Sequence, residues 1–435
     1  MNRASLGDGV AALKHNYRHA LVKIISPLLA PLATGGGGVG EGWSMVNLAL
    51  AAVLMSWDAA PTLAQRFESV LGVLDDTARG RPRVGRTYQG FIKALRACGR
   101  RPLELVGEHL RLLTRQAAGA CWMVGEFVVI GADGSRFDAP RTIGNEPLGF
   151  AGKDKCGPQM VALLLVHLGL MLPWAWRIGG VRQSERELLR GVLDTLPDRT
   201  LLVADAGFTG FELLGLLRAR NIHFLIRVGR GVNLLKELGS YRREGKNTVY
   251  LWPDALRAQP PLVLRLIKVG SMHLITSVLD PRRLSHAAAS EIYRRRWVLE
   301  TTFRALKQTL ERRKMRSGAA ENAKLELEWS IVGLWMLALV GVRALRAGRR
   351  DPRSLSPARA LAAVRAASRG RRTEAALART LREAVRDPYR RKGRKKAWRW
   401  AHKKNPTPPG TPRIHKATPA QVQQARLLLL KLAAA

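Results

Sequence analysis

The segment RTLLVADAGFTGFELLGLLRARNIHFLIRVG, residues 199–229, carries a strand, a helix and a second strand in succession. Its LLVA run is short and apolar and stops at Asp205, which is typical of a buried strand. TGFELLGLLRARN then repeats its leucines at helical spacing, and IHFLIRVG is apolar once more. A strand–helix–strand unit predicts an α/β sheet with helices on its faces.

The residues before this unit predict more of the same sheet. WMVGEFVVIGADGSRFDAP, residues 122–140, alternates and is rich in valine, so it predicts a strand that ends in a turn at Asp133. PQMVALLLVHLGLMLPWAWRIGG, residues 158–180, predicts one or two strands with a turn near Leu172 and Pro173. The following run SERELLRGVLDTL predicts a capped amphipathic helix.

Three parts are expected along the 435 residues. Residues 1–120 predict a helical domain, in which two basic helices at 85–116 fit a helix-turn-helix or any other basic hairpin. Residues 121–348 predict the α/β domain, with a β-rich insertion at about 229–285 and helices after it. Residues 349–435 predict a basic, partly disordered tail.

Charge points to the binding partner. The chain has 73 Lys+Arg against 33 Asp+Glu, a net charge of +40. Such an excess repels itself unless a polyanion neutralises it, and nucleic acid is the polyanion that fits best. The tail adds PYRRKGRKKAWRWAHKKNPTPPGTP, residues 388–412, where Trp398 and Trp400 lie among clustered cations.

Other classes of protein fit less well. The three cysteines, Cys98, Cys121 and Cys156, form no CxxC or Cys/His cluster, so a zinc site is not expected. Disulfides stay an alternative, but an odd and sparse set of cysteines fits a reducing cytosol better. The apolar runs at 160–174 and 331–342 are shorter than the ~20 residues that cross a bilayer. With no signal-peptide pattern either, the expected location is the cytoplasm, on the nucleoid when bound to DNA, and no membrane partner is expected.

Acidic residues are scarce, so their positions are informative. Asp133 and Asp205 both follow predicted strands, with a glycine one or two residues later. Ligands of open α/β sheets gather at the carboxyl ends of strands, and glycine allows a substrate to approach the backbone. The alternative interpretation is that each aspartate only shapes its turn.

A third acid lies in EIYRRRWVLETTFRALKQ, residues 291–308. At about 100° per residue, Tyr293, Arg296, Glu300 and Lys307 fall within roughly 60° of one another on a regular helix. One face would then carry a phenol, a guanidinium, a carboxylate and an ammonium group. An ordinary solvated helix face also mixes charges.

These motifs together resemble those of DDE transposases from bacterial insertion sequences, in the subgroup with a Tyr-Arg-Glu-Lys signature. Y-x2-R-x3-E-x6-K matches the four-residue helix signature, DGSRF at 133–137 resembles the first aspartate motif, and ADAGF at 204–208 resembles the second. The resemblance covers about 122–316, under half of the chain. It implies a ribonuclease H-like mixed sheet with flanking helices and a β-rich insertion before the last catalytic helix.

The resemblance also implies the site. Asp133, Asp205 and Glu300 would be the catalytic residues and would bind two Mg²⁺ ions, which Mn²⁺ can replace. Two ions roughly 4 Å apart stabilise the attacking and leaving oxygens of a phosphodiester. Asp138 competes with Asp133 for the first position, and the Gly134 motif favours Asp133.

The remaining signature residues would bind DNA. Arg296 and Lys307 would hold phosphates and Tyr293 would donate a hydrogen bond to one. Trp297 would stack on a flipped base or would simply fill the core.

The expected function is Mg²⁺-dependent cleavage at the ends of a mobile element and strand transfer into target DNA. A homodimer on DNA is expected, since two ends must be joined in one complex. The alternatives are a catalytically inactive or domesticated DNA-binding relative, a basic RNA-binding protein, and a nuclease that cuts without integrating. The sequence of the ends, the target preference and the present mobility of the element do not follow from the chain.

Overall fold

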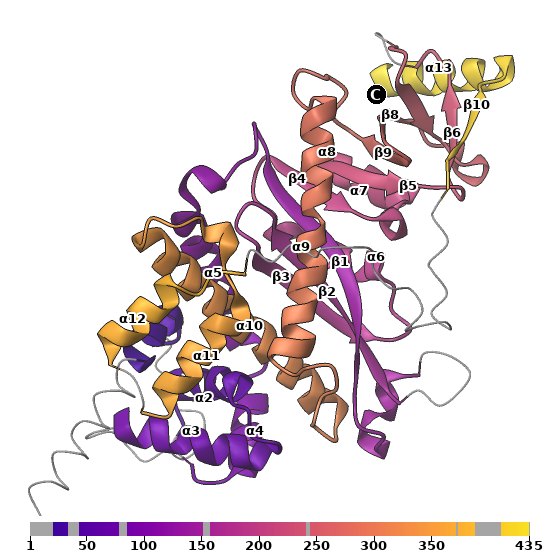
Figure 1. The fold of residues 1–435 in the computed structure, drawn as a ribbon. Coiled ribbons are helices and arrows are strands. Elements are labelled where there is room, and N and C mark those ends of the chain that lie inside the picture. The colour runs from indigo at the N-terminus through magenta and orange to yellow at the C-terminus, as the bar shows by residue number, and fades with distance from the viewer. Residues whose placement is uncertain are drawn as a thin grey trace, which may run out of the picture. The chain divides into compact units, whose positions relative to one another are not determined.

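The computed structural model describes residues 21–33, 43–77, 85–150, 157–240, 244–370, 373–387 and 410–434 (Figure 1). Trp398, Trp400 and Cys156, and most of the basic tail segment, lie outside these ranges. The contacts divide the chain into two units. The helical unit comprises Met1–Trp122, Gly134–Ser184 and Val298–Arg386, and the sheet unit comprises Met123–Asp133, Glu185–Trp297 and Asp387–Ala435.

Most of a 10-stranded mixed sheet belongs to the sheet unit, where the strand order is β10-β6-β7-β8-β9-β5-β4-β1. The strands are β1 (Val128–Asp138), β4 (Thr200–Ala204), β5 (His223–Val228), β6 (Asn233–Lys236), β7 (Thr248–Leu251), β8 (Leu262–Val269), β9 (Met272–Thr276) and β10 (Arg413–Lys416). Its helices are α6 (Glu185–Arg190), η4 (Leu193–Thr195), η5 (Ala206–Phe208), α7 (Phe211–Ala219), η6 (Asp254–Leu256), α8 (His286–Arg295) and α13 (Pro419–Ala434). The predicted mixed α/β class with flanking helices is confirmed.

The predicted strand–helix–strand unit is β4, α7 and β5. β4 is parallel to β1 and to β5, and all five of its residues are buried. α7 packs on β5 and β8 through its leucines, while Glu212 and Arg218 give it a charged residue near each end. The helix predicted after β3 is shorter than expected: α6 ends at Arg190 and a separate 3-10 turn follows.

The β-rich insertion is present and extends the sheet. β9 pairs antiparallel with β5, and β8, β7 and β6 follow in order. The end of the chain returns to this region, because β10 pairs parallel with β6 and is followed by α13. Residues 410–434 are therefore a strand and a helix in the structure, where the sequence predicted a partly disordered tail.

The helical unit holds the other half of β1 and the hairpin of β2 (Gln159–His167) and β3 (Leu172–Gly180). Two strands are present, as predicted, but their turn ends before Leu172. His167 accepts the Leu170 amide at 3.1 Å and closes this turn. Pro173 is tolerated inside β3 because it pairs with Val166 beside a register shift at Leu165/Val166, and bulges are among the places where strands accept proline.

Helices make up the rest of the helical unit. They are η1 (Ser26–Leu32), α2 (Met45–Trp57), α3 (Leu63–Thr77), α4 (Tyr88–Ala97), α5 (Arg101–Ala118), η2 (Gly119–Cys121), η3 (Ile143–Leu148), α9 (Trp297–Arg304), the π-helix η7 (Ala305–Thr309), α10 (Ala320–Ala347), η8 (Pro352–Ser354), α11 (Pro357–Ser368) and α12 (Glu374–Arg382). α4 and α5 are the predicted basic helices, joined at Gly99, whose φ of 60° suits glycine.

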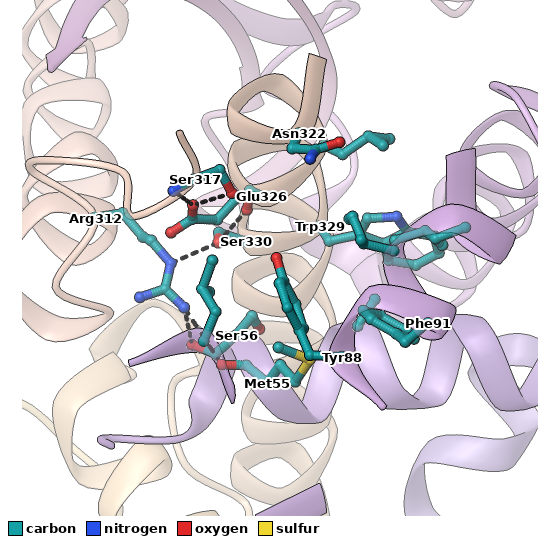
Figure 2. A pocket seen from close by; sticks show the side chains of 15 residues that line it. Met55, Ser56, Tyr88, Phe91, Arg312, Ser317, Asn322, Glu326, Trp329 and Ser330 are labelled. Atoms are coloured by element: carbon teal, nitrogen blue, oxygen red, sulfur yellow. Dashed lines mark hydrogen bonds between the residues drawn. The ribbon is translucent and has the colours of Figure 1, made fainter. Parts of the chain in front are cut away.

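α10 is the core helix of this unit. It is long and apolar enough to cross a membrane, but 83% of its most apolar window is buried within the protein. The chain just before α10 is fixed by Arg312, which is 1% exposed (Figure 2). Its guanidinium donates to Ser330 Oγ at 2.8 Å and to the carbonyls of Met55 and Ser56 at the end of α2. In the pocket that Figure 2 shows, the Glu326 carboxylate accepts hydrogen bonds from the amide and the hydroxyl of Ser317.

Candidate functional site

Asp133 and Asp205 occupy equivalent positions on neighbouring strands of the sheet unit. The parallel register pairs Gly131 with Val203, and two further residues along each strand lead to the two aspartates. Adjacent strands lie about 4.8 Å apart, and equivalent residues of parallel neighbours point to the same face. The two carboxylates are thus side by side where β1 and β4 stop pairing.

The boundary of β1 differs from the prediction. The strand continues to Asp138 and does not end at Asp133. Its pairing with β4 ends at Gly131, and the four residues from Asp133 to Arg136 are no longer buried, so this aspartate does lie at the end of the shared ladder. The strand continues to Asp138 because backbone hydrogen bonds hold its far end to other segments. Ala139 N donates to Pro158 O, and Met315 N donates to Asp138 O.

Asp205 caps the short helix η5. Its Oδ1 accepts the Gly207 amide at 2.8 Å, so the turn-shaping role is real. A carboxylate has about four lone-pair sites, so this bond leaves capacity for a cation. Arg186 supports the turn from outside, because its Nε donates to Gly207 O at 2.7 Å. Sequence reasoning missed Arg186, which lies in a run that predicted only a capped helix.

Tyr293 and Arg296 lie beside these aspartates in the sheet unit. Arg296 Nη1 is 3.4 Å from Asp133 Oδ2, and both side chains are less than one-fifth exposed. The Arg296 guanidinium also lies 5.8 Å from the centre of the Tyr293 ring. Burial raises the pKa of Tyr293, and the charge of Asp205 raises it further, while Arg296 and Arg227 act in the opposite direction. The phenol therefore keeps its proton near neutral pH and can donate a hydrogen bond.

Trp297 begins α9 and is 58% exposed. A core-filling tryptophan would be buried, so the alternative of plain core packing is wrong. Its ring is available to stack on an aromatic ligand such as a base.

Glu300 and Lys307 belong to the helical unit, and their helix is not regular. α8 ends at Arg295 and α9 begins at Trp297, and η7 is a π-helix in which Leu310 N donates to Ala305 O, five residues back. The wider turn changes the angle per residue. The predicted single face assumed a regular α-helix through Lys307, so for that residue it stays a prediction.

Lys307 contacts two residues of β1. Its Nζ donates to Ser135 Oγ at 2.7 Å and lies 4.9 Å from the centre of the Phe137 ring. Burial lowers the pKa of Lys307, and the nearby Asp138 carboxylate opposes that shift. The DGSRF motif thus connects to the last signature residue through Ser135, which the sequence did not identify as a contact.

Asp138, the competing first acid, accepts from Gln159 Nε2 at 2.7 Å within the helical unit. Across the described ranges, no three His, Cys, Asp or Glu side chains come together closely enough to hold a metal ion. The pair that does lie in register, Asp133 and Asp205, offers the oxygen ligands that Mg²⁺ prefers.

Comparison with known proteins identifies the region that carries these residues. Residues 128–336 match the family model described as a transposase DDE domain. The chain is 27% identical over 199 residues to the transposase InsG for insertion sequence element IS4 of Escherichia coli (strain K12), a match covering 42% of this chain and 44% of that protein. It thus spans less than half the length of this relative.

One solved structure also resembles the chain, the cryo-EM structure of the piggyBac transposase synaptic complex with hairpin DNA. The TM-score is 0.37 at 12% identity, covering 86% of this chain and 81% of the other. The mixed α/β fold follows from the strand order and register of the sheet itself.

Proposed function

Because residues 128–336 match the model of a transposase DDE domain and resemble the transposase of a bacterial insertion sequence, we propose that the chain is a DNA transposase. It cleaves phosphodiester bonds at the ends of a mobile element and transfers the freed strands into target DNA. The match to the family model carries the proposal, because it includes the two aspartates that the sheet places in register.

The catalytic residues we propose are Asp133, Asp205 and Glu300, which hold divalent metal, two Mg²⁺ ions that Mn²⁺ can replace. The bound ions supply charge neutralisation at the phosphate and activate the attacking hydroxyl or water. Asp133 and Asp205 are suited to this by their register. Glu300 enters the proposal from its place in the Tyr-Arg-Glu-Lys motif.

Four side chains position the DNA in this proposal. Arg296 gives directional hydrogen bonds to a phosphate and Lys307 gives a compact charge. Tyr293 donates through its protonated phenol, and the exposed ring of Trp297 stacks on a base. Phosphoryl transfer depends on such positioning and charge neutralisation more than on covalent chemistry by the protein.

We further propose the domain roles expected from the sequence. Residues 1–120, with the basic helices α4 and α5, bind the ends of the element. Residues 121–348 are the ribonuclease H-like catalytic domain, and the basic residues of 349–435 bind flanking or target DNA. The active form on DNA is a homodimer without a membrane partner, in the cytoplasm. The charge of +40 supports a DNA-bound state.

The test is cleavage of a plasmid that carries the element's own ends, with Mg²⁺ present. Asp205→Ala should lower the cleavage rate at least about 100-fold, since even outer-shell partners of a metal ligand cost 10–100-fold. DNA binding should survive the substitution. Asp198→Ala is the matched control, because Asp198 is exposed in the turn before β4 and should leave cleavage unchanged.

One observation favours a second candidate, a catalytically inactive DNA-binding relative. The Asp133 carboxylate is already paired with Arg296. A wild-type protein that binds the ends but never cuts them, with either Mg²⁺ or Mn²⁺, would establish this candidate and refute the transposase.

A further inference from the structure

A basic groove lies on the β-rich insertion of the sheet unit. It has a volume of about 910 Å³ and is formed by the loop 245–248, strands β8 and β9, and the segment 279–286. None of its residues belongs to the three acidic motifs or to the helix signature. The groove therefore has no role in the proposed cleavage chemistry.

The charge of this insertion groove is strongly positive. Lys246, Lys268, Arg265 and Arg282 line it, against the single carboxylate of Asp280. That carboxylate is neutralised by Arg282, whose Nη2 lies 3.0 Å from Asp280 Oδ2. The groove thus has three cations in excess and attracts an anion.

Two buried side chains that line the groove, those of Arg265 and His273, each carry one nitrogen atom with no hydrogen-bond partner in the described part of the chain. Arg265 is 8% exposed; its Nη2 donates to Leu284 O, but its Nε has no hydrogen-bond partner among the residues that the structure describes. His273 is 9% exposed, and its Nδ1 likewise lacks a partner there. Leaving a buried polar group unpaired costs about 1–3 kcal/mol.

We propose that the insertion groove binds the phosphodiester backbone of DNA, which rests on the proposed transposase function. Arg265 and His273 line the groove, and the guanidinium of Arg265 adds positive charge to its wall. Lys246, Lys268 and Arg282, which are exposed, add charge at its rim. The volume lies within the range of small-molecule ligand sites, about 300–1,000 Å³.

The experiment measures how the DNA dissociation constant of the full chain depends on salt. Each phosphate that a lysine neutralises contributes about 0.9 to the slope of log K against log salt. Lys246→Gln and Lys268→Gln should each reduce the slope by about 1, and the double variant by about 2. Lys431→Gln removes the same charge from exposed α13, outside the groove, and should leave the slope unchanged.

The outcomes separate the two proposals. Suppose that the wild-type protein binds and cleaves DNA, but that the groove variants show the same salt slope as Lys431→Gln. The groove proposal is then refuted and the proposed function is not. If the wild-type protein does not bind DNA at all, the proposed function falls and the groove proposal with it. Cleavage rates at saturating protein should stay within twofold for the groove variants, because none of them touches the acidic motifs.

Discussion

His167 is a buried base held between two backbone groups. Its Nδ1 accepts from Leu170 N, so its Nε2–H donates to Trp122 O at 3.0 Å. Burial lowers its pKa from 6.5 to about 4, and the bond to Trp122 opposes the shift only in part. Below pH 6.5 His167 is therefore protonated in the unfolded chain, whereas in the folded protein it stays neutral until about pH 4.

The free energy of unfolding should thus fall as the pH drops from 6.5 toward 4, with His167 contributing at most roughly 3 kcal/mol of the loss. Urea denaturation at a series of pH values measures this. His167→Gln cannot titrate, so its curve should be flatter over that interval. His223 and His273 are common to both proteins, so the difference between the curves isolates His167. Parallel curves would contradict the assignment.

Arg312 gives a second test at the scale of one residue. Its burial lowers its pKa to about 9, yet it stays charged at neutral pH and is bonded to Ser330, Leu310 and the end of α2. Arg312→Met should lower the free energy of unfolding by about 3–5 kcal/mol, because it leaves buried carbonyls unpaired. Arg313→Met, on the exposed neighbour, should change it by less than about 0.5 kcal/mol. Similar losses in both variants would contradict a specific role of the Arg312 bonds.

Single residues show what sequence reasoning could and could not reach. The aspartates were found because a carboxylate after a buried strand is a local pattern in a chain poor in acids. Contacts between distant segments were not found, since Ser135 meets Lys307 across 172 positions and Arg312 meets Ser56 across 256. Such contacts depend on how distant elements pack, and the spacing of apolar residues within one segment does not indicate this.

At the scale of elements, strands and helices with a clear period were predicted well, including the insertion. The π-helix η7 was not, because its extra residue leaves no mark on the apolar spacing. The pairing of β10 with β6 was also missed. RIHK is only four residues long and follows a strongly basic segment, so neither alternation nor composition distinguishes it from a loop.

The crossing of α2 and α10 supplies a test at this scale. Gly333 lies where a Cβ atom would overlap the Ser56 hydroxyl and crowd Trp57, whose Nε1 donates to Gly333 O at 3.0 Å. Alanine is the better helix former by about 1 kcal/mol, but overpacking costs about 1–3 kcal/mol. Gly333→Ala should therefore lower the free energy of unfolding.

The matched control is Gly215→Ala in α7, where a Cβ atom would meet nothing within 4 Å. There the helix preference acts alone, and the free energy of unfolding should rise by about 0.5–1 kcal/mol. Opposite signs for the two substitutions in urea denaturation would confirm that close packing decides the first. A gain of stability in both would show that Ser56 moves aside at no cost.

For the molecule as a whole, the net charge of +40 is the property that follows most directly from the amino-acid composition. Like charges on a compact fold repel one another, so the folded state is stabilised by whatever polyanion neutralises them. A ligand at 100 times its dissociation constant adds about 2.7 kcal/mol to the free energy of unfolding. Heparin or a duplex of arbitrary sequence should therefore raise the Tm by several degrees.

Salt should remove this rise in Tm. At 1 M salt the Debye length is only about 3 Å, so the charges are screened, and the free-energy gain from counterion release is lost. The measurement is thermal unfolding with and without heparin at 0.05 and 1 M NaCl, roughly the range over which such contacts weaken. The rise in Tm should be large at low salt and nearly absent at high salt. A rise that persists at 1 M would instead indicate a ligand held by specific contacts that are shielded from salt. No rise at either salt concentration would show that the cations are already balanced within the fold.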